Sequence, residues 1–171
     1  SGMRGGGRKR GDESVEDLMP EKRVLNLGAG NRIVPGAVNH DRVKHRPEID
    51  VVWDLNDLPW PWEDNSFDHV VARAVLEHIA PDLLQSLNEC WRILAPGGTI
   101  QIKVPYWRAD AAYEDPTHRW FFTLGSFDLF DPDTERGQQY GFYTERKWRI
   151  VRPARLNNAK TSIFVDLQVR K

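Results

Sequence analysis

The 171-residue sequence predicts a single α/β domain with a mostly parallel sheet. Short β-branched or apolar runs, each ended by Gly, Asp or Pro, alternate with helical periodicity over the first two thirds of the chain. Two later runs alternate apolar with polar residues, as half-buried antiparallel strands do. The sheet is therefore expected to be parallel except for an antiparallel pair that closes the chain.

Seven short strands are expected. The five of the parallel part lie at residues 24–27, 37–41, 50–54, 67–72 and 99–104. The closing pair lies at residues 147–151 and 162–169, on either side of a segment that contains Pro153 and two asparagines. Ligands of open parallel sheets bind beyond the carboxyl ends of the strands, so the residues after each strand are the first candidates for a site.

One long helix is expected between the fourth and fifth strands. Apolar residues recur there at spacings of three and four, and Pro96-Gly97-Gly98 ends the pattern: Leu83, Leu84, Leu87, Cys90, Trp91 and Leu94. Pro81 suits the first turn of this helix, and a shorter helix is expected over residues 74–79.

Composition limits the class of protein. Hydrophobic residues make up 40% and charged residues 29%, and no apolar run approaches the roughly 18 residues of a membrane span. The single cysteine, Cys90, excludes an internal disulfide and a multi-cysteine zinc site, which favours a reducing, cytoplasmic location. Residues 1–14 are basic and glycine-rich and are expected to form a disordered tail, in which Ser1-Gly2 resembles a cloning remnant; residues 15–171 form the domain.

The net charge of −1 hides an uneven distribution. Residues 1–10 carry four bases and no acid, and residues 135–171 carry nine bases and three acids. The middle of the chain has 11 bases against 22 acids. Basic ends can contact an anionic partner such as nucleic acid, although such runs are more often solvated surface.

Three strand ends carry residues suited to one nucleoside. Gly28-Ala29-Gly30 follows the first strand and permits a tight turn beside a ligand. It is not the dinucleotide fingerprint, because Ile33 stands at the third glycine position. Asp41 ends the second strand, where a carboxylate can accept both hydrogen bonds of a ribose diol. Asp54-Leu55 ends the third, where an acceptor and a backbone donor can read an adenine edge.

Five segments in this order resemble class I S-adenosylmethionine-dependent methyltransferases of the type 11-like group. The resemblance covers roughly residues 22–127 and implies a Rossmann-like three-layer sandwich with S-adenosyl-L-methionine as cofactor. The segments are Val24-Leu-Asn-Leu-Gly-Ala-Gly30, Asp54-Leu-Asn-Asp-Leu-Pro59, Asp64-Asn-Ser-Phe-Asp68, Val75-Leu-Glu-His-Ile79 and Arg92-Ile-Leu-Ala-Pro-Gly-Gly98.

The resemblance also implies which residues contact the cofactor. The glycine segment would hold the methionine part, Asp41 the ribose, and Asp54 with Leu55 the adenine. Arg73 and Ala74, after the fourth strand, would line the same cleft. The full set implied for the cofactor is Asn26, Gly28, Ala29, Gly30, Asp41, Arg42, Asp54, Leu55, Arg73 and Ala74.

The chain departs from this family in two places. Asn26 stands where most members carry an acid that orders the glycine loop or binds the methionine ammonium. Residues 31–37 and 42–49 are too short for the usual helical crossovers, so the first helix is expected to be reduced to a turn. One face of the sheet would then need shielding by tryptophans (Trp53, Trp60 and Trp62) or by a second subunit, which makes a homodimer possible.

No metal site is expected. Glu77-His78 is similar to the helix of small-RNA 2′-O-methyltransferases and some quinone O-methyltransferases, which bind a metal with Glu-x-x-Glu-His. Ala74 replaces the first of those glutamates, so only Glu77, His78 and His118 are available. A structural or cofactor-flanking role is therefore favoured for Glu77 and His78.

The wall expected for a methyl acceptor follows the fifth strand. His118 is the expected catalytic base, with Asp115 orienting it and Tyr106 beside it. Trp107 can stack on a flat or cationic acceptor, and Arg119 can hold an anionic one. The alternative is that residues 115–118 form a cap and turn, followed by three core aromatic residues.

The sequence therefore predicts a methyltransferase whose acceptor is unidentified. Residues 123–146 supply only a modest insertion over the site, so the acceptor can be a small molecule or a macromolecule. Two alternatives stay open: a nucleic-acid (RNA) methyltransferase that uses the basic ends, and a non-catalytic module that binds S-adenosylmethionine.

Overall fold

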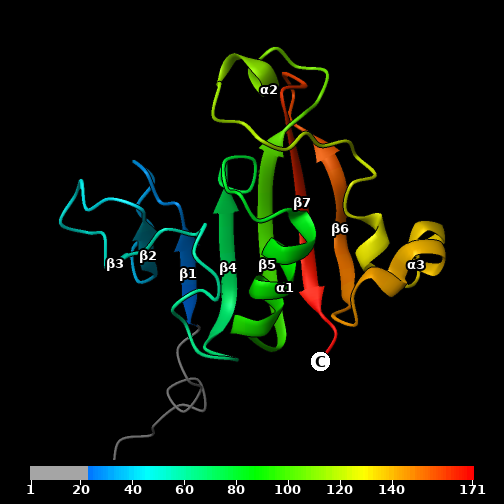
Figure 1. The fold of residues 1–171 in the computed structure, drawn as a ribbon, viewed down its shortest axis with the longest axis horizontal. Helices are drawn as coiled ribbons and strands as arrows, with labels where there is room; N and C mark the ends of the chain where they lie inside the picture. The colour runs from blue at the N-terminus through cyan, green and yellow to red at the C-terminus, as the bar shows by residue number, and fades with distance from the viewer. Residues whose placement is uncertain (1–22) are drawn as a thin grey trace, which may run out of the picture.

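The computed structural model describes residues 23–171, so the predictions for the basic tail and for the start of the domain lie outside the described residues. These residues form a seven-stranded sheet in the order β3-β2-β1-β4-β5-β7-β6 (Figure 1). The strands are β1 (Val24–Leu27), β2 (Val38–Asp41), β3 (Val51–Val52), β4 (Phe67–Arg73), β5 (Leu94–Pro105), β6 (Trp148–Leu156) and β7 (Ser162–Val169).

The pairing confirms the predicted sheet. Strands β3, β2, β1, β4 and β5 are parallel to their neighbours, whereas β7 runs antiparallel to both β5 and β6. The chain moves outward from β1 to β3 and then returns to β4 on the other side of β1. The carboxyl ends of β1 and β4 therefore form a switch point, where loops diverge and leave room for a ligand.

Helix α1 (Leu83–Ile93) packs on one face of the sheet beside β5 (Figure 1). It begins with a capping box, in which the Asp82 carboxylate accepts from the Gln85 N–H and the Gln85 side chain accepts from the Asp82 N–H. Its apolar stripe, including Leu87, Cys90 and Ile93, is fully buried in the main core.

The remaining helices are short. They are α2 (Ala111–Glu114), η2 (Asp128–Phe130), α3 (Glu135–Tyr140) and η3 (Gly141–Tyr143). In Figure 1, α2 lies above the carboxyl end of β5, and α3 lies beside β6.

Several predicted boundaries and one predicted helix were wrong; the third strand, predicted over residues 50–54, is only Val51–Val52. The predicted helical pattern ran to Leu94, but Leu94 already pairs with Phe67, so β5 includes the Pro-Gly-Gly segment. Strand β6 continues past Pro153 because it lies at the edge of the sheet, where the missing N–H removes no ladder bond on the open side. Residues 74–79 form turns instead of a helix, because Ala74 has a φ of 55°.

The segment after β1 is a series of turns, as its length predicts. Tryptophans take the place of the missing helical cover. Trp60 is buried, and the Trp62 ring makes edge contacts with His40 at 5.4 Å, Trp60 at 6.4 Å and Phe67 at 6.0 Å. Trp53 also packs against the core. The expected shielding by tryptophans is therefore present, and a homodimer stays a prediction.

A buried ion pair fixes this tryptophan segment to α1. The Arg92 guanidinium donates to both carboxylate oxygens of Glu89 at 2.8 and 2.9 Å. It also donates to the backbone carbonyls of Trp60 and Trp62 at 3.1 and 2.7 Å and to Asp64 at 3.0 Å. Glu89 in turn accepts the Trp60 N–H at 2.7 Å. The segment that replaces helical cover is thus held by one charged network.

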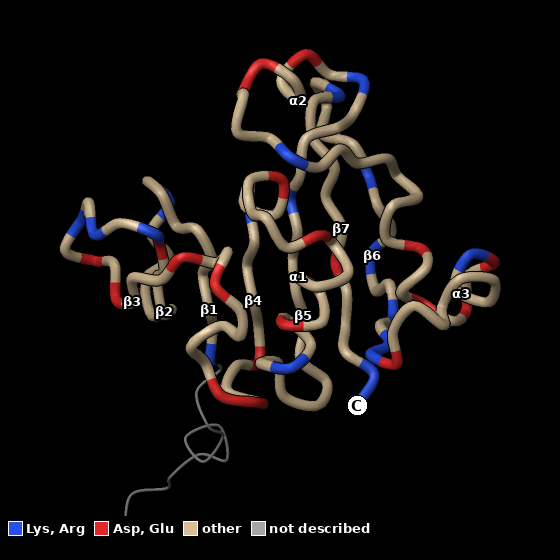
Figure 2. Tube along the Cα trace, in the orientation of Figure 1, with Lys and Arg blue, Asp and Glu red and all other residues tan. Residues whose placement is uncertain are grey.

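Basic residues are frequent along β6 and near the carboxyl terminus (Figure 2). Several are paired within the domain: Arg152 and Arg155 contact Asp166, and Arg170 contacts Asp131 and Asp133. Part of the basic excess of residues 135–171 is therefore neutralised internally. Within residues 23–171, no helix has the length and apolar character needed to cross a membrane.

Candidate functional site

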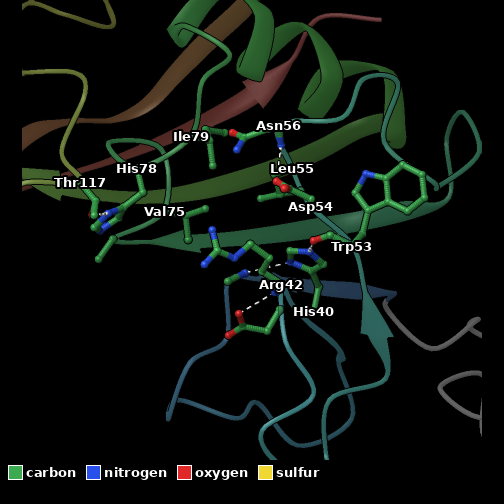
Figure 3. A pocket seen from close by; sticks show the side chains of 13 residues that line it. His40, Arg42, Trp53, Asp54, Leu55, Asn56, Val75, His78, Ile79 and Thr117 are labelled. Atoms are coloured by element: carbon green, nitrogen blue, oxygen red, sulfur yellow. Dashed lines mark hydrogen bonds between the residues drawn. The ribbon is translucent and has the colours of Figure 1, made fainter.

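A cleft opens at the carboxyl ends of β1 to β4, at the switch point of the sheet. Its volume of about 360 Å³ is in the range of small-molecule sites. Figure 3 shows one wall from the ends of β2 and β3 and another from the segment that follows β4. The lining residues are Gly28, His40, Asp41, Arg42, Trp53, Asp54, Leu55, Asn56, Ala74, Val75, His78, Ile79 and Thr117.

The structure brings six of the predicted cofactor residues together in this cleft. They are Gly28, Asp41, Arg42, Asp54, Leu55 and Ala74. The other four, which are Asn26, Ala29, Gly30 and Arg73, lie next to it without lining it. Their contacts show what each of them does in the fold.

Gly28 lies against Val75 of the opposite wall. Its φ is 57°, and a Cβ placed on it would lie 2.4 Å from Cγ2 of Val75. An L-side chain therefore meets both backbone strain and a steric clash at this position. Only glycine allows β1 to turn here while Val75 forms the opposite wall.

Asn26 orders the glycine loop. Its buried amide donates to the Arg32 carbonyl at 2.7 Å and to the Asn39 side-chain oxygen at 2.9 Å. Asn39 also accepts the Val34 N–H at 2.9 Å. The two asparagines thus hold the short turn segment in place of a helix, and Asn26 acts within the protein where the family carries an acid.

Asp41 ties the end of β2 to the same loop. One carboxylate oxygen accepts the Gly30 N–H at 2.7 Å, and the other accepts the Arg42 N–H at 2.6 Å. A carboxylate oxygen has two lone pairs, so acceptor capacity is left for a ligand in the cleft. Asp41 therefore combines a structural tether with a candidate ligand contact.

His40 joins three strand ends and was not predicted to take part. Its Nδ1 accepts the Gly28 N–H at 3.1 Å, and its Nε2–H donates to the Trp53 carbonyl at 2.9 Å. Both bonds require the neutral ring with its proton on Nε2. Burial lowers the pKa of His40 below its usual value, which favours this neutral form.

We expect the His40 pKa to make the fold sensitive to acid. Below pH 6.5 the unfolded chain binds a proton at His40 that the folded chain does not, so stability falls with pH by up to about 1.4 kcal/mol per pH unit. His40→Gln keeps an acceptor and a donor but cannot be protonated. The melting temperature of the wild-type protein should therefore fall relative to that of the variant between pH 7 and pH 5.5.

The other titrating groups are common to both proteins, so the difference in melting temperature isolates His40. A difference that stays constant over this pH range would contradict the assignment of the neutral ring.

Asp54 and Asn56 shape the wall at the end of β3. The Asp54 carboxylate accepts the Asn56 N–H at 2.9 Å, which forms a compact turn around Leu55. The Asn56 side chain accepts the Ala80 N–H at 2.7 Å and so connects this turn to the segment after β4. Asn56 was missed because nothing in its local sequence indicates a contact 24 residues away.

Arg73 and Ala74 have separate roles. The Arg73 guanidinium donates to the Gln101 side chain at 3.0 Å, so it braces β4 against β5. The Ala74 N–H donates to the Lys103 carbonyl at 2.9 Å, and its left-handed backbone turns the chain into the cleft wall. This turn brings Val75, His78 and Ile79 to face the ends of β2 and β3 (Figure 3).

None of the five residues predicted for the acceptor wall lines the cleft, His118 and Asp115 included, although Thr117 of the same segment does. Thr117 lines the cleft, and its hydroxyl donates to Asp115 while it accepts from His78 Nδ1 at 2.8 Å. His118 lies beside His78, with ring centroids 4.6 Å apart. Its Nδ1 contacts the Ala112 carbonyl at 2.9 Å, so the backbone orients the ring, whereas Asp115 lies 3.8 Å from Nε2.

Tyr106, Trp107 and Arg119 do not line the cleft. Tyr106 packs against the core, and Trp107 is 38% exposed with the Arg108 guanidinium 4.9 Å from its ring centroid. The Arg119 N–H donates to the Glu77 carbonyl at 2.7 Å, which fixes this loop to the segment after β4. Of the aromatic residues of the alternative interpretation, Phe122 is core, whereas Trp120 and Phe121 are exposed.

Comparison with known proteins shows what this arrangement is similar to. Residues 25–102 match a family described as a methyltransferase domain, and this range contains nearly all of β1, then β2 to β4, α1 and all but one of the residues that line the cleft. The sheet order and the site at the switch point agree with the same family. Over this range the chain is similar to S-adenosylmethionine-dependent methyltransferases. S-adenosylmethionine is the cofactor of this family.

Solved structures share the methyltransferase fold. The YcgJ protein of Bacillus subtilis superposes with a TM-score of 0.57 at 16% identity, over 88% of this chain and 93% of that one. A Thermotoga maritima S-adenosylmethionine-dependent methyltransferase, described as a possible histamine N-methyltransferase, gives a TM-score of 0.53 at 16% identity, over 92% and 86%.

Curated relatives match over the methyltransferase domain. Demethylmenaquinone methyltransferase of Listeria welshimeri is 33% identical over 104 residues, which cover 55% of this chain and 42% of that protein. A probable S-adenosylmethionine-dependent methyltransferase of Mycolicibacterium smegmatis is 33% identical over 102 residues, or 59% of this chain and 36% of that protein. The chain spans about two fifths of the length of these curated relatives.

Proposed function

We propose that the protein transfers a methyl group from S-adenosylmethionine to an acceptor, as an enzyme of EC class 2.1.1. The cleft supports this proposal most directly, because it combines a glycine turn and two carboxylates at adjacent strand ends in a volume suited to a nucleoside. We assign the ribose to Asp41 and the adenine to Asp54 and Leu55. The methionine part would pass over Gly28 towards Ala74.

Methyl transfer depends more on the position of the acceptor than on reactive side chains of the protein. The acceptor's electron pair forms a bond to the methyl carbon while the carbon–sulfur bond breaks, and sulfur keeps the bonding electrons as a neutral thioether. Holding the acceptor about 3 Å from the methyl carbon, in line with the breaking bond, supplies most of the rate enhancement. A base is needed only where the acceptor loses a proton.

The side of the cleft that His78 and Thr117 line is the proposed place for the acceptor. His118 lies behind this side of the cleft, with its ring centroid 4.6 Å from that of His78, and its Nε2 carries a lone pair because Nδ1 donates to a carbonyl, so Nε2 can accept a proton. The role of His118 as base stays a prediction, and Asp115 would influence it by charge across 3.8 Å instead of by a hydrogen bond. The acceptor itself is unidentified.

Cofactor binding tests the nucleoside assignment. Asp41→Ala and Asp54→Ala should each weaken S-adenosylmethionine binding by about tenfold or more, since each removes a charge-assisted hydrogen bond worth about 1.5–3 kcal/mol. Asp57→Ala is the matched control, because Asp57 is an exposed carboxylate on the same loop that does not line the cleft. Titration calorimetry gives the affinities, and equal affinities in all three variants would refute the assignment.

Transfer of labelled methyl groups into fractionated cell extract tests the activity. Label in the small-molecule, protein or nucleic-acid fraction identifies the acceptor class. Binding of S-adenosylmethionine with no transfer to any fraction would instead indicate a non-catalytic binding module. Failure of S-adenosylmethionine to raise the melting temperature would refute both functions.

A further inference from the structure

We propose that Glu77, His78 and His118 bind a divalent transition-metal ion at the edge of the cleft. Each residue offers one ligand atom, and the three atoms lie within 4.8 Å of one another. Glu77 and His78 follow β4, whereas His118 comes from the loop after α2, so the fold brings together two segments 40 residues apart. The sequence predicted no metal here because one glutamate of a longer motif is replaced by Ala74.

The distances are close to those of a metal site. His78 Nε2 lies 3.7 Å from Glu77 Oε1, and the two imidazole rings are 4.6 Å apart between centroids. Ligand atoms about 2.1 Å from a tetrahedral metal are about 3.4 Å from one another. Small side-chain rotations therefore bring the three atoms into ligand positions. The bond from the Arg119 N–H to the Glu77 carbonyl holds the two segments together.

Both histidines have an Nε2 lone pair available for the proposed metal ion. His118 Nδ1 faces the Ala112 carbonyl, which only accepts, so the proton lies on Nδ1. Thr117 donates its hydroxyl proton to Asp115, so it must accept from His78 Nδ1. Each Nε2 is therefore unprotonated and has a lone pair that can bind a metal ion. A histidine that binds a metal through one nitrogen and donates from the other to an oxygen is typical of protein metal sites.

Glu77 supplies the observation that points to a cation. The residue is 1% exposed, and neither carboxylate oxygen has a hydrogen-bond partner among residues 23–171. A buried carboxylate without a donor is costly to the fold. A bound cation would compensate this carboxylate directly.

The donor set indicates the kind of metal. Two imidazole nitrogens and one carboxylate oxygen favour Zn²⁺, Co²⁺, Fe²⁺ or Mn²⁺ over Mg²⁺ and Ca²⁺, which prefer all-oxygen sites. Three protein ligands leave coordination positions open, and His78 lines the cleft. A ligand in the cleft can therefore complete the coordination. Metal binding itself does not depend on the proposed methyl transfer, but it would occupy the lone pair of His118 Nε2, so His118 can act as a base only in the metal-free protein.

Metal binding by the chelator-treated full chain tests this site. Titration calorimetry with Zn²⁺ should give one tight site per chain, and Co²⁺ should give the visible absorption of a low-coordinate complex. Glu77→Gln, His78→Gln and His118→Gln should each reduce the affinity at least tenfold. His69→Gln is the matched control, because it removes a histidine on β4 that lies outside the cluster, and it should bind like the wild-type protein.

The melting temperature separates metal binding from folding. Glu77→Gln removes the buried charge, so at pH 8 we expect the metal-free variant to be at least as stable as the wild-type protein while Zn²⁺ no longer raises its melting temperature. His78 is one-third exposed, so its variant should also fold. Absence of stoichiometric binding by the wild-type protein, or binding unchanged in all three variants, would overturn the proposal.

Discussion

Replacing Gly28 with alanine is expected to weaken S-adenosylmethionine binding by about 100-fold or more. The new Cβ costs about 1–2 kcal/mol at a φ of 57° and another 1–3 kcal/mol from its overlap with Val75, 2.4 Å away. To relieve this strain, either β1 must change its turn or Val75 must move into the cleft. Both movements displace the surface on which the methionine part is proposed to lie. Titration calorimetry measures the loss.

Two matched variants separate the clash from general backbone strain. Gly36 has a φ of 77° with open space around it, so Gly36→Ala should cost about 1 kcal/mol of stability and leave cofactor affinity unchanged. Adding Val75→Ala to Gly28→Ala should restore part of the affinity, because it removes the overlapping methyl groups. Equal affinity losses for Gly28→Ala and Gly36→Ala would contradict this account.

Removing the Arg92 side chain should give the largest loss of stability, about 3–5 kcal/mol. Arg92→Ala leaves Glu89 as a buried carboxylate without its cation, and it frees the backbone carbonyls of Trp60 and Trp62. The segment that covers the sheet in place of a helix would lose its attachment to α1. Urea unfolding monitored by circular dichroism measures the free energy of unfolding.

An exposed ion pair is the control for this prediction. Arg23 contacts Asp68 at 3.4 Å with side chains 52% and 36% exposed, so Arg23→Ala should cost less than about 1 kcal/mol. Arg92→Lys keeps the charge but loses the planar fork, and it should lie between the two. Similar losses in the free energy of unfolding for Arg92→Ala and Arg23→Ala would show that burial does not determine how much an ion pair contributes to stability.

The sequence was sufficient for features that depend on local pattern. Strand periodicity, the glycines and aspartates at strand ends and the rule that sites lie beyond those ends predicted that Gly28, Asp41 and Asp54 line one cleft, and the family resemblance added Ala74. The short crossover after β1 was predicted from chain length alone. These features need no knowledge of which distant residues meet.

Features that depend on distant contacts could not be predicted in the same way. The sequence around His40 does not indicate its role, because its two side-chain hydrogen bonds run to the ends of β1 and β3. The approach of His118 to Glu77 depends on how the loop after α2 folds back. Ala74 was expected to begin a helix, but its N–H bonds to the Lys103 carbonyl on the neighbouring strand and its backbone is left-handed. Tertiary contacts override local propensity at these positions.

The two halves of the sheet are held by different forces. Strands β4, β5 and β7 are buried by α1 and by a continuous apolar core. The corner around β2 and β3 depends more on polar bonds made by Asn39, His40 and Asp41, for which water competes. Local opening should therefore require less free energy at this corner than in the centre. A nucleoside seated there would act as a missing structural element, since its binding energy would be spent partly on holding that corner closed.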